Sequence, residues 1–72
     1  MPDPYKILAK LRLVLDNPNP NTEVQKFMVM ELCTEAILSM DTYIQEHPYD
    51  SELVGIIVRK HIGEAQQQVG VQ

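Results

Sequence analysis

The chain has 72 residues, of which 44% are hydrophobic and 22% charged, and ten acidic against six basic residues give a formal net charge of −4. This length allows one small domain, residues 1–72, and excludes dinucleotide-binding folds and (β/α)8 barrels, which need a few hundred residues. The negative charge argues against binding to duplex nucleic acid, because modules of that class neutralise phosphates with a basic surface.

The first predicted element is an amphipathic helix over residues 4–16. Asp3 can serve as its N-cap, and Pro4 suits the first helical position, where no amide proton is needed. Apolar residues then recur at spacings of three and four, which is typical of one helix face. Lys6, Lys10 and Leu13 fall outside this stripe. The stripe consists of Ile7, Leu8, Leu11, Val14 and Leu15.

The second predicted element, residues 23–46, lies between two proline-containing connectors, residues 17–21 and 47–50. Proline lacks an amide donor and disfavours a helical residue before it, so helices end at such connectors. Thr22 and Gln25 have the spacing of a capping box at the helix start. The periodicity predicts a long helix whose buried arc contains Val29, Met30, Leu32, Cys33, Ala36, Ile37, Met40, Tyr43 and Ile44.

The third predicted element is a helix over residues 51–67, capped by Asp50 or Ser51, and residues 68–72 form a polar C-terminal tail. The run 53–58 is rich in β-branched residues and would also suit a buried strand. We favour a helix because a single strand would have no partner. The predicted apolar arc contains Leu53, Val54, Ile57, Val58, Ile62, Ala65 and Val69, and His61 falls within it.

Together these segments predict an all-α fold, a three-helix arrangement with a long central helix. At 1.5 Å per residue the central helix is about 36 Å long and the others are about 20 and 25 Å long, so neither covers it fully. A chain of this size also buries only a modest core. We therefore expect oligomerisation to complete the fold, as a homodimer or a higher oligomer.

Acidic and apolar residues mix on the nominally polar side of the central helix. Residues 21–52 contain seven of the ten acidic residues and one basic residue, Lys26. Exposed single apolar residues are common in proteins, and that is one interpretation of this pattern. The other is a second seam that binds a protein. That seam is the candidate partner-binding surface, and it consists of Val24, Phe27, Glu31, Glu35 and Leu38.

These features favour a small non-enzymatic helical interaction protein, an adaptor, inhibitor or regulator that acts through protein–protein contacts. No set of nucleophile, base and orienting residue is identifiable, and we expect no cofactor. The alternative is an oligomer that binds or sequesters an anionic metabolite or nucleotide at its subunit boundaries. A tyrosine stacked on such a ligand and lysines neutralising it would form that site, with Tyr5, Lys6 and Lys10 as the candidates.

Three further side chains have a structural interpretation. His61 precedes Glu64 by three residues, the reverse of the order in di-metal bundles, so we expect a core or interface histidine and no metal site. His47 is placed to interact with the last carbonyls of the central helix. Cys33 is expected to be a buried, unreactive thiol.

The sequence also bears on location. A single cysteine excludes an intramolecular disulfide, and no basic region followed by an apolar run begins the chain. No segment approaches the ~20 apolar residues that span a bilayer. We expect a cytoplasmic protein with no membrane partner.

Overall fold

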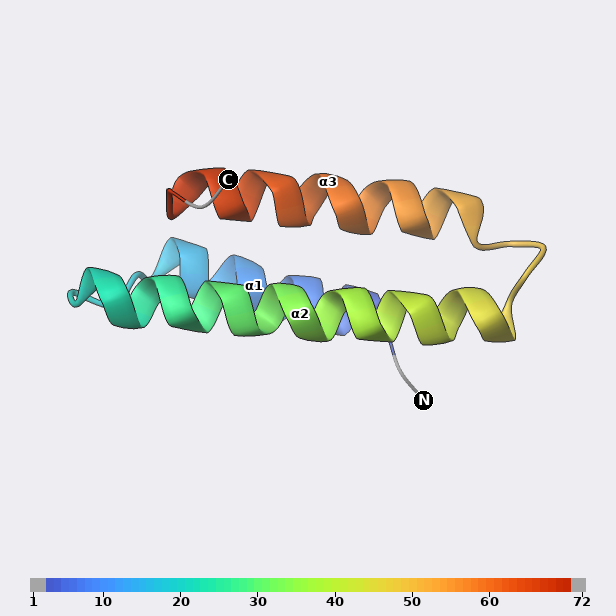
Figure 1. The fold of residues 1–72 in the computed structure, drawn as a ribbon, viewed down its shortest axis with the longest axis horizontal. Coiled ribbons are helices and arrows are strands. Elements are labelled where there is room, and N and C mark those ends of the chain that lie inside the picture. Colours follow the sequence, from blue (N-terminus) through green and yellow to red (C-terminus); the bar gives the residue numbers. More distant parts are fainter. Residues whose placement is uncertain (1–2, 71–72) are drawn as a thin grey trace.

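In the computed structural model, which describes residues 3–70, three helices run back and forth along one long axis (Figure 1). They are α1 (Pro4–Asp16), α2 (Thr22–Glu46) and α3 (Glu52–Gln68). The predicted all-α fold with a long central helix is confirmed, and each helix end lies within one residue of its predicted position. Gln68 belongs to α3, so the predicted tail is shorter than expected, and its last two residues lie outside the described ones.

The helix starts differ in how they are capped. The Asp3 carboxylate accepts a hydrogen bond from the Tyr5 amide at 3.0 Å, as the sequence predicts for α1. In α2 the cap is Asn21, whose side-chain oxygen accepts from the amides of Glu23 and Val24 at 3.0 and 3.2 Å. The predicted capping box is therefore wrong, because its first residue already lies inside the helix. Ser51, one of the two predicted caps, is the N-cap residue of α3, but its side chain makes no cap hydrogen bond.

Gln25, which was predicted to belong to the capping box, instead links α2 to the end of α1 by hydrogen bonds. Gln25 is buried, its Oε1 accepts a hydrogen bond from the Asn19 amide at 2.8 Å, and its Nε2 donates to the Val14 carbonyl at 3.0 Å. These two bonds hold the proline-rich connector in place and fix the level at which α1 lies against α2.

The core lies between the three helices, and α1 and α3 each pack mainly on α2, with few contacts to one another. Three predictions of burial are wrong: Ile37 is partly exposed, Leu53 is 64% exposed and His61 is exposed. They stand on helix flanks, and only the strip of each helix that faces its neighbours is covered. The buried hydrophobic residues are Leu8, Leu11, Val29, Cys33, Ala36, Met40, Val54, Val58, Ile62 and Ala65.

The molecule is elongated, with extents of 41 × 23 × 16 Å. α2 extends beyond α1 towards the second connector (Figure 1), as the predicted difference in helix length requires. Since α1 and α3 occupy two sides of α2, a third side of α2 has no helix neighbour. Within residues 3–70, none of the helices is long and apolar enough to cross a membrane.

Candidate protein-binding face

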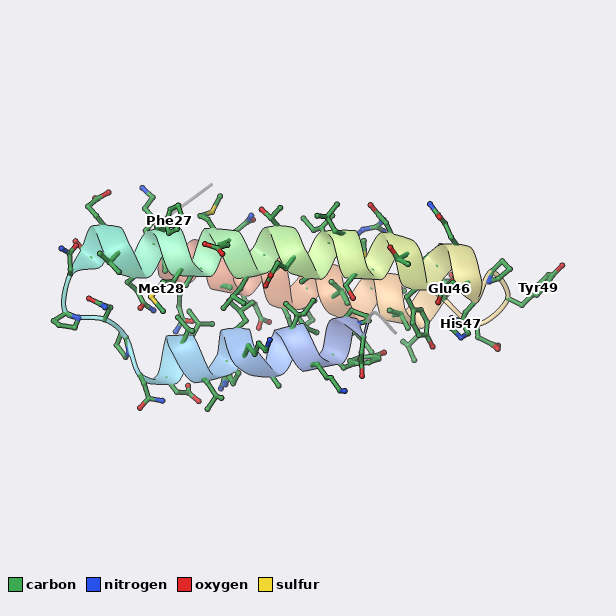
Figure 2. The ribbon with its side chains drawn as sticks, turned by 90° about the horizontal axis from the view of Figure 1, so that it is seen from below. Phe27, Met28, Glu46, His47 and Tyr49 are labelled. Carbon is green, nitrogen blue, oxygen red and sulfur yellow. The ribbon has the colours of Figure 1, made fainter. Side chains whose placement is uncertain are left out.

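The side of the molecule away from α3 is built by α1 and α2 alone (Figure 2). We call it the α1/α2 face. At 100° per residue, its α2 members fall within an arc of about 80°. All of its side chains are exposed. The face consists of Lys6, Lys10 and Leu13 of α1, and Val24, Phe27, Glu31, Glu35 and Leu38 of α2.

A groove of about 420 Å³ runs between the two helices on this face. Its α1 wall contains Lys6 and Lys10, and its α2 wall contains Glu35 and Leu38. Two lysines predicted to bind a ligand and two residues predicted to bind a protein therefore share one groove. Tyr5, the third predicted ligand residue, does not line it. The other lining residues are Asp3, Ile7 and Ser39.

A second hollow, of about 440 Å³, lies on α2 beside this groove, and Glu35 lines both. Phe27 is 66% exposed at one end of the hollow, and Leu38, on the same side of α2, is 63% exposed. In Figure 2 the Phe27 side chain projects to the side of α2 away from α1. The hollow is lined by Phe27, Met30, Glu31, Thr34 and Glu35.

The charges of the face are divided between its helices. Within residues 3–70 the ion pair that forms joins Arg12 to Asp16 at 3.6 Å, outside the face. The two lysines of α1 and the two glutamates of α2 on the face form none there. The α1 side has two lysines against the carboxylate of Asp3 and is net basic, whereas the α2 side is acidic, and both sets of charges are available to a bound molecule.

Two side chains on or beside this face had no predicted role. Leu13 is 64% exposed, and its position off the apolar stripe was the sequence signal for it. Ser39 is buried in the groove wall, and its Oγ makes no hydrogen bond with residues 3–70. No sequence pattern marks Ser39, because its burial depends on where α1 crosses α2.

The cysteine and the two histidines lie in surroundings that favour structural roles. Burial raises the pKa of the Cys33 thiol, which favours the protonated, unreactive form. The prediction for His47 is confirmed: its Nδ1 lies 3.2 Å from the Tyr43 carbonyl, and the two rings stack with centroids 4.2 Å apart. His61 Nδ1 lies 2.9 Å from the Ile57 carbonyl at the helix surface. Among residues 3–70, no group of three or more histidine, cysteine or acidic side chains is placed to hold a metal ion.

Two other hollows lie away from this face. One, of about 370 Å³, separates α1 from α3 and has an apolar floor that includes Leu8 and Leu11. The other lies at the second connector, where Tyr49, Leu53 and Ile56 are exposed. Neither combines unpaired charges of both signs with large exposed apolar side chains as the α1/α2 face does.

Comparison of the chain with protein-family models, with curated proteins and with solved structures finds no significant match in any of the three.

Proposed function

We propose that the protein is a non-enzymatic helical interaction protein, an adaptor, inhibitor or regulator, that acts through protein–protein contacts made by the α1/α2 face. The observation that supports this most is the exposure of Phe27 and Leu38, two large apolar side chains set among glutamates on the uncovered side of α2. Clustered exposed apolar groups rimmed by polar ones are typical of protein-binding surfaces. A second copy of the chain is the first partner in this proposal.

The uncovered side of α2 supports self-association. The helices α1 and α3 cover α2 on two sides, and no helix formed by residues 3–70 covers the third. Removing a Phe or Leu side chain from water contributes about 1.5–3 kcal/mol, so a second copy that covers these side chains gains stability. The cytoplasmic location remains a prediction.

Replacement of Phe27 tests the face directly. We expect Phe27→Asp to weaken self-association at least about tenfold, because a carboxylate buried between apolar groups loses its hydration without gaining a hydrogen bond. Light scattering after size-exclusion chromatography measures the association, and circular dichroism measures helicity, which we expect to be unchanged because Phe27 is exposed.

Leu53→Asp is the matched control, since Leu53 is about as exposed but lies on α3. Equal association constants for the two variants would contradict the assignment of the face.

The alternative function, binding of an anionic metabolite or nucleotide, has weaker support. Lys6 and Lys10 do line one groove, but the carboxylates of Asp3 and Glu35 line it too and repel an anion. A ligand that binds only the folded state raises the melting temperature. A rise with nucleotides that is lost in Lys10→Glu would favour this alternative over the proposed one.

A further inference from the structure

We infer that a second copy binds the α1/α2 face through a two-fold axis parallel to the helices, so that α1 of each copy lies over α2 of the other. The inference rests on the proposed function and adds to it the geometry of the partner. It follows from three features of the face: basic residues lie on α1 and acidic ones on α2, certain residues of the two helices lie at the same height along the helix axis, and Leu13 is exposed.

Charge selects the direction of the axis. A symmetric dimer buries the same surface on both subunits. If the axis crossed the helices at right angles, α2 would lie on α2 of the other copy, and with the axis at the level of Glu31 and Glu35 these glutamates would lie opposite glutamates. If the axis runs along the helices, the acidic α2 side meets the basic α1 side, which carries Lys6 and Lys10. Only the second arrangement brings opposite charges together.

The level of the helices then decides which residues meet. A rotation about an axis along the helices leaves each residue at its own height. Residues of α1 and α2 that share a groove within one copy therefore also face each other between copies. Lys10 and Glu35 share such a groove, together with Lys6 and Leu38, so the lysines of one copy come opposite Glu35 and Leu38 of the other.

Leu13 provides an independent observation. Because α1 and α2 are antiparallel, the step from Lys10 to Leu13 runs in the same direction along the axis as the step from Glu35 to Glu31. Leu13 thus stands at the level of the hollow lined by Phe27, Glu31 and others.

The position of Leu13 around the axis of α1 also agrees with a contact to the hollow on α2 of the other copy. At 100° per residue, Leu13 lies beyond both lysines on the flank of α1 turned away from α2. The two-fold rotation carries that flank to the far flank of the other copy's α2, where Phe27 projects (Figure 2). The exposed Leu13 side chain of one copy accordingly fits the hollow of the other.

Reversal of the two sets of charges tests the arrangement. One variant carries Lys6→Glu and Lys10→Glu, and a second carries Glu31→Lys and Glu35→Lys. Each variant alone places like charges opposite each other, so we expect its self-association to weaken about 100-fold. Mixed together they restore opposite charges at both contacts, so we expect a one-to-one heterodimer with nearly wild-type affinity. One variant is labelled uniformly with ¹⁵N, because Lys and Glu differ little in mass, and native mass spectrometry then separates the two homodimers from the heterodimer.

The matched controls reverse the same number of charges on α3. One carries Arg59→Glu with Lys60→Glu, and the other carries Glu52→Lys with Glu64→Lys. We expect both to self-associate as the wild type does. A single chain with all four face reversals is a further check on folding, and we expect it to self-associate as well.

Two results would overturn the inference: a mixture of the reversed variants that stays monomeric, or reversed variants that dimerise alone. If Phe27→Asp still disrupts the wild-type dimer in either case, the proposed face stands and only the axis is wrong. A wild-type chain that never associates would reject both.

Discussion

The Gln25 side chain of α2 hydrogen-bonds both the first connector, at Asn19, and the last turn of α1, at Val14. We expect Gln25→Ala to lower the free energy of unfolding by about 1–3 kcal/mol, because the Asn19 amide and the Val14 carbonyl lose their buried partner. Thermal and urea unfolding followed by circular dichroism measure the loss. Gln45→Ala, at an exposed position of the same helix, is the control. Equal stability of the two variants would show that the two Gln25 hydrogen bonds contribute nothing to the free energy of unfolding.

At the scale of residues, sequence reasoning found exposure more reliably than it found specific contacts. It placed Phe27 and Leu38 outside the core because they break the periodicity of α2, and both are exposed. It assigned Gln25 to a cap because that pattern is local, whereas its partner Val14 is eleven positions away. The placement of His61 in the buried arc of α3 was wrong, because hydropathy defines a broad arc, while burial depends on where neighbouring helices lie.

At the scale of elements, α3 contains a glycine with no structural need for it. A Cβ added at Gly63 would meet no atom within 4 Å, and the position is helical. We expect Gly63→Ala to raise the free energy of unfolding by about 1 kcal/mol, since alanine restricts the unfolded chain and favours helix. The same unfolding experiment measures it.

Gly70 is the contrasting position, because its φ of 79° lies in the left-handed region that alanine disfavours. Gly70→Ala is expected to give no gain. A Gly63→Ala variant no more stable than the wild type would mean that α3 is frayed at this point in solution.

The helices themselves were predictable to within a residue at their ends because their limits are set locally. Proline ends α1 and α2, and Asp3 with Pro4 begins α1. The run 53–58 was ambiguous, since its residues suit both a strand and a helix. Val54 and Val58 are buried, whereas Ile56 between them is 56% exposed. A strand would place all three side chains on one face, so this burial follows the helical spacing.

At the scale of the whole molecule, the meeting of Lys10 with Glu35 was not predictable. It depends on the level at which two antiparallel helices pack, and the Gln25 hydrogen bonds and the connector set that level. The two candidate sites therefore looked like rivals in the sequence, whereas the fold makes them neighbours on one face.

Sedimentation equilibrium of the unmodified protein, from low to high micromolar concentration, measures whether the chain self-associates. Self-association through the α1/α2 face predicts a species of twice the 8.2 kDa chain mass, with a share that rises with concentration. A mass of 8.2 kDa at every concentration would show that the chain is a monomer and that the exposed side of α2 needs no second copy to cover it.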